Sequence, residues 1–352
     1  KKMSLNGDII KQVADDIKIV YTPFNGTGNV PVRRILRELG FKNVYVVPEQ
    51  EKPDPNFTTL EYPNPEDPKA FTYALKLAKE VDADIVLAKD PDADRLGVYS
   101  KDVKSGEYKS FTGNMSGMLI AEYLLSQRKE RGLIHKNGAF VKTIVSTNMA
   151  DAIAKEYNVK LIEVLTGFKF IGEQIKFFEQ QHTYEYEFGF EESYGYLSGT
   201  SVRDKDAVNA AVLVCEMAAN YKAQGLTLLD KLEQLREEFG FYAQRLLTFQ
   251  YEGESGAAKM ADIMRKLRAP LDTFQDAHFP TATRIDYQND ETGLPKSDVL
   301  SFALADGSKI IVRPSGTEPK LKAYLFARGE NQAAAEKVLD ELETLMNGYC
   351  KE

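Results

Sequence analysis

Short apolar runs alternate with longer amphipathic stretches over the first two thirds of the chain. Residues 17–21 and 84–88 are apolar runs that predict buried strands, and residues 31–40 place their apolar side chains on one helical face. Residues 48–68 contain six of the fourteen prolines, so we expect a long ordered loop without helix there. Strands that alternate with helices predict an α/β unit.

The same alternation begins again near residue 114 and predicts a second α/β unit. The expected strands of this unit cover residues 139–145, 159–164 and 184–190. Helices are expected from about residue 114, from residues 148 and 170, and from about residue 206. Two α/β units therefore follow each other along the chain.

After a charged helix at 228–238 the pattern changes to paired strands. The expected strands are 246–251, 283–287, 299–304, 309–313 and 321–327, with helices near 257–267 and 333–346. The predicted fold class is α/β, with two tandem three-layer α/β domains followed by an antiparallel α+β C-terminal domain. We place the domain boundaries at residues 1–104, 105–238 and 239–352.

Composition and charge narrow the class of protein. A chain of 352 residues with 43% hydrophobic residues is long enough for several packed domains, and it has no apolar run of about 18 residues that could span a bilayer. The net charge of −8 argues against a broad nucleic-acid surface, so an anionic ligand needs a local basic cluster. Two distant cysteines and no signal peptide favour a cytoplasmic protein, and the start at Lys1 suggests a piece of a longer chain.

The most informative motif is an acidic loop directly after the strand at 84–88. Asp90, Asp92 and Asp94 alternate, so in an extended loop their carboxylates would face one point and repel one another unless a cation were bound. An EF-hand is excluded because Arg95 and Lys101 occupy its sixth and twelfth positions. Oxygen ligands alone favour Mg²⁺, with Arg95 as a second anchor for a phosphate. The alternative is a solvated acidic turn.

A second motif follows the apolar strand at 310–312. Arg313, Ser315, Gly316 and Thr317 offer a guanidinium, two hydroxyls and exposed backbone amides. These groups together form a typical phosphate cradle, although Ser-Gly-Thr alone is also an ordinary turn.

Two strand ends and one helix start supply further candidates. Glu191 and Ser193 follow a strand and are suited to binding vicinal sugar hydroxyls, with a surface turn as the alternative. Arg203 and Lys205 precede an expected helix start, where the helix dipole also attracts anions.

A similar corner between a strand and a helix contains Thr166, Gly167 and Lys169. Both this corner and the pair at 203 and 205 are also compatible with simple helix caps.

Four of these motifs resemble, in their order along the chain, those of the α-D-phosphohexomutase superfamily, in particular its phosphoglucomutase branch. They are the acidic loop at 90–95, the Thr-Gly-Phe-Lys corner at 166–169, the Glu-Glu-Ser loop at 191–193 and the Arg-Pro-Ser-Gly-Thr loop at 313–317. The resemblance covers essentially the whole chain and corresponds to the second, third and fourth domains of such enzymes. It implies Mg²⁺ on the three aspartates, with Arg95 in the same loop, and substrate phosphate on the loop at 313–317. It also implies sugar hydroxyls on Glu191 and Ser193, and assistance with phosphate or orientation from Lys169 and Lys205.

The resemblance also implies what the chain lacks. Members of the superfamily carry a first domain with a Thr-x-Ser-His-Asn loop that presents a phosphorylated serine, and this motif is absent here. The intact protein is expected to interconvert glucose 1-phosphate and glucose 6-phosphate through a hexose bisphosphate, whereas this chain alone should bind without turnover. Asn25 stands where relatives often have His, and the general base is not assigned.

Several alternatives stay open at this stage. The Glu-Glu-Ser-Tyr-Gly form resembles the glucose-specific branch, but a phosphomannomutase or phosphopentomutase fits the same loops. A haloacid-dehalogenase-type phosphatase would use Asp90 as nucleophile and Asp92 as acid, and a non-catalytic sugar-phosphate sensor would only bind. The expected partners are hexose phosphates, without nucleic acid or membrane.

Overall fold

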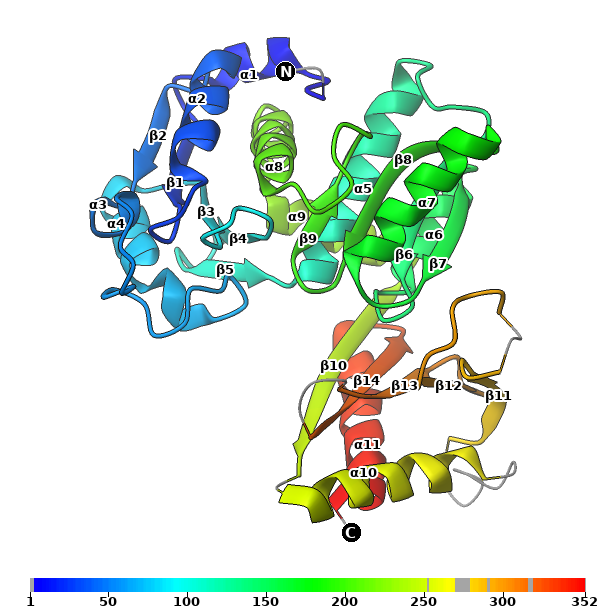
Figure 1. The fold of residues 1–352 in the computed structure, drawn as a ribbon. Helices are drawn as coiled ribbons and strands as arrows, with labels where there is room; N and C mark the ends of the chain where they lie inside the picture. Colours follow the sequence, from blue (N-terminus) through cyan, green and yellow to red (C-terminus); the bar gives the residue numbers. More distant parts are fainter. Residues whose placement is uncertain (1–2, 252, 270–278, 290–291, 316–318, 352) are drawn as a thin grey trace. The chain divides into compact units, whose positions relative to one another are not determined.

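The computed structural model describes residues 3–251, 253–269, 279–289, 292–315 and 319–351. The chain divides into two units, Lys1–Leu235 and Arg236–Glu352. The first contains both expected α/β regions, and the second contains the antiparallel region (Figure 1).

The first sheet has the strand order β2-β1-β3-β4-β5. Its strands are β1 (Lys18–Thr22), β2 (Asn43–Val46), β3 (Ile85–Lys89), β4 (Leu96–Lys101) and β5 (Tyr108–Phe111). β1 pairs in parallel with β2 and β3, whereas β4 pairs antiparallel with β3 and β5. The carboxyl end of β3 therefore leads through one turn directly into β4, and this turn is the acidic loop.

Four α-helices and one 3₁₀ helix surround the strands of this sheet. They are α1 (Gly7–Val13), α2 (Asn29–Leu39), α3 (Pro48–Glu51), η1 (Pro68–Phe71) and α4 (Thr72–Val81). The expectation that residues 48–68 contain no helix is wrong at α3, because Pro48 occupies its first turn, where a missing amide hydrogen costs nothing. Helix α2 buries Val32 and Leu36 and ends at Gly40 with a φ of 106°, as the sequence pattern predicts.

The second sheet has the order β7-β6-β8-β9 and lies in the same unit. Its strands are β6 (Gly138–Thr143), β7 (Lys160–Val164), β8 (Glu185–Glu191) and β9 (Gly195–Leu197). The helices of this region are α5 (Gly113–Glu130), α6 (Met149–Glu156), α7 (Phe168–Gln181), α8 (Ala207–Lys222) and α9 (Leu228–Phe239). β6 pairs in parallel with β7 and β8, and β9 turns back antiparallel to β8.

Helix α8 joins the two α/β regions. It contacts α1, α2, β3 and β4 of the first region as well as α5 and β9 of the second (Figure 1). Its fully buried Glu216 accepts hydrogen bonds from the Leu5 amide and the Tyr123 hydroxyl, both at 2.9 Å. The acidic loop and the Glu-Glu-Ser loop consequently belong to one packed body.

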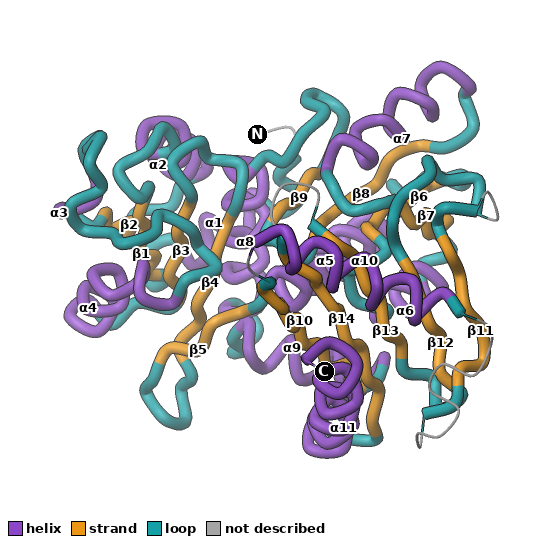
Figure 2. The backbone as a smooth tube through the Cα atoms, turned by 60° about the horizontal axis from the view of Figure 1, so that its bottom comes forward, coloured by secondary structure: helices purple, strands orange, loops and turns teal. Residues whose placement is uncertain are grey.

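The second unit contains one antiparallel sheet, of order β10-β14-β13-β12-β11. Its strands are β10 (Phe241–Gln250), β11 (Thr281–Asp286), β12 (Leu300–Leu304), β13 (Lys309–Pro314) and β14 (Lys320–Gly329), and its helices are α10 (Gly253–Arg268) and α11 (Gln332–Lys351). Helix α11 packs on β10 and β14 and buries Ala335, Leu339, Leu342 and Met346 (Figure 2). The helix expected near residues 333–346 is confirmed.

The predicted fold class is confirmed, but three strands were not expected. β4, β5 and β9 each pair antiparallel with a neighbour, so their identity depends on contacts that the periodicity of the chain does not reveal. Among the described residues, none of the helices combines the length and apolar character that a bilayer crossing requires.

Candidate active site

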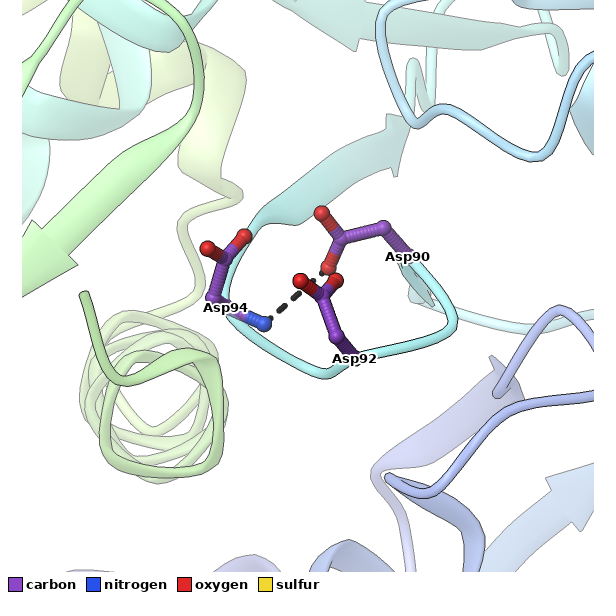
Figure 3. Close-up of side chains that lie close together, drawn as sticks. All are labelled: Asp90, Asp92 and Asp94. Atoms are coloured by element: carbon purple, nitrogen blue, oxygen red, sulfur yellow. Dashed lines mark hydrogen bonds between the residues drawn. The ribbon is translucent and has the colours of Figure 1, made fainter. Parts of the chain in front are cut away.

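The three aspartates of the acidic loop lie together, as expected. One carboxylate oxygen from each of Asp90, Asp92 and Asp94 lies within 4.8 Å of the others (Figure 3). The route is a turn rather than the expected extended loop, because the Ala93 amide donates to the Asp90 carbonyl at 3.0 Å and Ala93 has a φ of 64°. The turn therefore brings the carboxylates together by folding back on itself.

Asp90 anchors this turn from the end of β3. Its side chain is only 11% exposed and accepts a hydrogen bond from the Asp94 amide at 3.1 Å (Figure 3). It also accepts one from the Arg95 amide at 2.8 Å. Burial raises the pKa of Asp90 to about 7, and the neighbouring Asp94 and Asp92 add to this shift. A bound cation would favour the ionised carboxylate and reverse the shift.

The loop after β1 packs against the acidic turn and forms a hydrogen bond with it. A Cβ atom on Gly26 would lie 2.3 Å from Pro91 Cα, and the Thr27 amide donates to the Pro91 carbonyl at 2.8 Å. Gly26 thus allows a close approach of two loops, while the left-handed backbone falls on Phe24 and Asn25, with φ of 46° and 58°. Asn25 donates to the Lys52 carbonyl at 2.8 Å, which ties this loop to the end of α3.

Two cations already approach the aspartates. Lys205 Nζ lies 2.9 Å from Asp94 Oδ2, and Arg95 Nε lies 3.7 Å from Asp90 Oδ2 and 3.9 Å from Asp94 Oδ1. These two cationic side chains therefore partly neutralise the three carboxylates. Burial favours a lower pKa for Lys205, but its contacts with Asp94 and Asp204 outweigh burial and raise the pKa.

The Glu-Glu-Ser loop lies beside the acidic turn. The Leu96 amide donates to the Tyr194 carbonyl at 3.1 Å, and Arg95 forms an isolated antiparallel bridge with Gly195. A Cβ atom on Gly195 would lie 2.4 Å from Lys205 Cδ, so this glycine makes room for the lysine. Ser193 lies in the turn between β8 and β9 and is partly buried.

Glu191 connects this loop with the Thr-Gly-Phe-Lys corner. The residue is 6% exposed, and its side chain accepts a hydrogen bond from the Gly167 amide at 2.9 Å, at the N-terminus of α7. Burial raises the pKa of Glu191, while Lys205 and the Gly167 hydrogen bond oppose the shift. Thr166 next to it has a buried hydroxyl oxygen with no hydrogen-bond partner among the described residues.

The predicted basic residues Lys169, Arg203 and Lys205 differ in whether they contact the acidic turn. Lys205 lies 5.8 Å from the centre of the Phe168 ring and so touches all three loops, whereas Lys169 is exposed over the ring of Phe170. Arg203 is exposed and pairs with Glu179 of α7. The structure therefore groups Lys205 with the acidic turn and leaves Arg203 on the surface of α7.

The predicted phosphate loop belongs to the second unit. Arg313 lies near the end of β13 opposite Lys322, and the Ser315 amide donates to the Lys320 carbonyl at 2.7 Å. Gly316 and Thr317 lie outside the described residues.

Three further charged residues of this unit are not among the predicted site residues. Glu66 pairs with Arg95 Nη1 at 2.9 Å, and Glu192 accepts the Thr143 hydroxyl at 3.2 Å. Lys89 is fully buried, its Nζ has no hydrogen-bond partner among the described residues, and burial lowers its pKa to about 7. A lysine that ends an apolar strand could have been noticed in the sequence, whereas the contacts of the two glutamates depend on the fold.

Comparison with known families supports one assignment for the whole chain. Models of the phosphoglucomutase/phosphomannomutase family match residues 2–106 as α/β/α domain II, residues 112–239 as α/β/α domain III and residues 252–345 as the C-terminal domain. These matches favour the expected superfamily over the haloacid-dehalogenase type of phosphatase.

Curated relatives and solved structures agree with the models. A phosphoglucomutase of Staphylococcus epidermidis is 36% identical over 338 residues, which cover 93% of this chain and 60% of the relative. A probable phosphomannomutase of Haemophilus influenzae is 37% identical over 337 residues, which cover 95% of this chain and 65% of the relative. The chain thus spans about 60% of the length of the curated relatives that it matches.

The fold is shared with solved structures of low sequence identity. The open form of parafusin, a phosphoglucomutase from Paramecium, matches all of this chain and 62% of its own length, with a TM-score of 0.73 and 20% identity. Together with the three family models, these likenesses show that the chain belongs to the phosphoglucomutase/phosphomannomutase family.

Proposed function

We propose that this chain forms domains II to IV of a Mg²⁺-dependent phosphoglucomutase. The whole protein would interconvert glucose 1-phosphate and glucose 6-phosphate through a phosphoserine, supplied outside this chain, and a hexose bisphosphate. The observation that carries the proposal is the cluster of three carboxylate oxygens within 4.8 Å, directly beside Lys205 and the Glu-Glu-Ser loop.

The donor set fits a hard divalent cation. Asp90, Asp92 and Asp94 offer only oxygen ligands, at a separation that one small ion can bridge. When bound, Mg²⁺ would neutralise charge on the transferred phosphoryl group. The backbone amides of Asp94 and Arg95 both donate to Asp90 Oδ1. These hydrogen bonds fix the carboxylate in place and leave Oδ2 for the cation.

The neighbouring residues would bind the sugar and its phosphates. We assign the sugar hydroxyls to Glu191 and Ser193, and the orientation of the substrate at the acidic turn to Lys205 and Arg95. Thr166, Gly167, Lys169 and Arg203 would complete this side of the site. Arg313, Ser315, Gly316 and Thr317 would bind the phosphate that is not being transferred, since phosphoryl transfer depends mainly on positioning and charge neutralisation.

Glucose phosphates are the proposed substrates because of the Glu-Glu-Ser-Tyr-Gly sequence of the sugar loop. Similar chains carry the names phosphoglucomutase and probable phosphomannomutase, so mannose phosphate is the principal alternative and a pentose phosphate the next. The buried free Cys215 and Cys350 fit a reducing compartment, and we place the protein in the cytoplasm. Domain boundaries at residues 1–104, 105–238 and 239–352 remain our assignment.

The test uses purified chain 1–352 and calorimetric titration with each sugar phosphate. We expect Mg²⁺-dependent binding of glucose 1-phosphate and glucose 6-phosphate without interconversion, because the phosphoserine loop is absent from the sequence. Addition of a phosphoserine domain from a relative, fused ahead of Lys1, should generate mutase activity. Binding without any activity in the fusion would favour a sugar-phosphate sensor, and turnover by the chain alone would contradict the assignment of the nucleophile.

A further inference from the structure

Glu66 lies in the proline-rich segment that the proposed chemistry leaves without a role. Its carboxylate is 43% exposed and pairs with Arg95 Nη1 at 2.9 Å. The Glu66 amide donates to Asn64 Oδ1 at 2.9 Å, and this hydrogen bond holds the backbone at Glu66. The segment thus presents one carboxylate to the arginine that ends the acidic turn.

Packing on β4 sets the position of this carboxylate. A Cβ atom on Gly97 would lie 2.8 Å from Pro65 Cβ and 2.8 Å from the ring of Phe71. Gly97 follows Arg95 by two residues, so the absence of a side chain there allows Pro65 to rest on the strand beside the arginine. Glu66 is consequently held by the fold near Arg95 rather than placed there by chance on a mobile surface.

The distances around Arg95 are unequal. Its guanidinium is at hydrogen-bond distance from Glu66, but its Nε lies 3.7 Å from Asp90 and 3.9 Å from Asp94, beyond a direct hydrogen bond. A guanidinium can bind carboxylates through two parallel hydrogen bonds, and Asp90 and Asp94 offer oxygens close to each other. Without Glu66, the same side chain would be free to close on the aspartates and compete with a cation.

We propose that Glu66 is a positioning residue, which holds the Arg95 guanidinium off Asp90 and Asp94 so that their oxygens stay open to a divalent cation. The inference rests on the proposed function, because it assumes a cation site at these aspartates. It adds a residue from a distant loop whose effect on the cation passes through Arg95.

A double-mutant cycle on chain 1–352 tests this role. The dissociation constant for Mn²⁺ is measured by electron paramagnetic resonance of the free ion, and for Mg²⁺ by competition, in wild type, E66Q, R95M and E66Q/R95M. The matched control is E61Q, which removes the same charge from the same loop, where Glu61 is exposed and pairs with Lys69 at 3.3 Å. Circular dichroism and thermal unfolding verify that each variant is folded.

We expect E66Q to weaken cation binding about fivefold, the upper range for a partly exposed ion pair, and E61Q to change it less than about twofold. In the R95M background, E66Q should change binding less than about twofold, because the competing guanidinium is gone. If E66Q weakened cation binding equally with and without Arg95, or no more than E61Q does, the effect would be one of general charge. Either result would overturn the positioning role of Glu66. Cation binding in wild type separates that result from failure of the proposed function, since a wild-type chain that binds no cation overturns both.

Discussion

Lys205 Nζ lies 2.9 Å from Asp94 Oδ2, although the two residues belong to different α/β regions of the chain. The lysine passes across Gly195 and lies over the ring of Phe168, so one side chain joins the acidic turn, the Glu-Glu-Ser loop and the corner before α7. The Lys205 ammonium group and a divalent cation would both be attracted to the Asp94 carboxylate. Binding of a divalent ion and the position of Lys205 are therefore expected to be coupled.

Replacement of this lysine tests the coupling. We expect K205M to strengthen Mn²⁺ binding about three- to tenfold, because a cation that competes for Asp94 is removed. The same variant should weaken glucose 1-phosphate binding, since Lys205 is also the proposed cation for the substrate. For the Mn²⁺ titration K169M is the matched control, because Lys169 is exposed over Phe170. Equal effects of the two substitutions would contradict a special position for Lys205.

Gly26 provides a test of how the acidic turn is supported. A methyl group at this position would meet Pro91 Cα at 2.3 Å, so G26A should push the two loops apart. We expect a loss of about 1–3 kcal/mol in unfolding free energy, as for other overpacked sites, together with weaker Mn²⁺ binding. In G7A the added methyl group meets nothing within 4 Å, and this variant should behave like wild type in thermal unfolding and in the Mn²⁺ titration. A tolerated G26A would show that the turn does not depend on the loop after β1.

We expect Glu192 to make the stability of the chain depend on pH. Burial raises the pKa of Glu192 from 4.5 to about 7, and the neighbouring Glu191 adds to this shift. Between pH 4.5 and pH 7 the folded chain therefore retains a proton on Glu192 that the unfolded chain has released. Stability contributed by this proton is present below about pH 4.5 and declines as the pH rises to about 7, by at most about 1.4 kcal/mol per pH unit.

The variant E192Q removes this titration while keeping the shape of the side chain. Urea unfolding between pH 4.5 and pH 7 should show a shallower decline than in wild type. Glu185, exposed on the same strand β8, provides the matched control variant E185Q. Parallel curves for wild type and E192Q would mean that folding does not raise the pKa of Glu192.

Much of the fold follows from local pattern. The apolar faces of α2 and α11 can be seen in the sequence because their apolar side chains repeat with the period of a helix. The end of α2 can be seen because a glycine, Gly40, follows it. The strands β4 and β9 are not, because each is defined by antiparallel pairing to a preceding strand. The long-range pairing, and not the propensity of a few residues, decides their conformation.

The candidate site shows the same division. The alternating aspartates indicate a cation site, and their convergence is confirmed, although by a turn at Ala93 and not by an extended loop. The approach of Lys205 to Asp94 and of Glu66 to Arg95 could not be predicted, because each contact joins segments that are far apart in sequence. Spacing along the chain thus reveals ligands within one loop, whereas the fold reveals the charges that act on them.

The most direct test of the account is a Mn²⁺ titration of chain 1–352 and of its D92N variant, followed by electron paramagnetic resonance. Asp92 is an exposed member of the triad, so its carboxylate can be replaced by an amide without disturbing the core. D8N, at an exposed position of helix α1, is the control. The account predicts one Mn²⁺ site per chain that Mg²⁺ displaces, weakened at least about tenfold by D92N and unchanged by D8N. Binding that D92N leaves unaltered, or no binding in wild type, would contradict it.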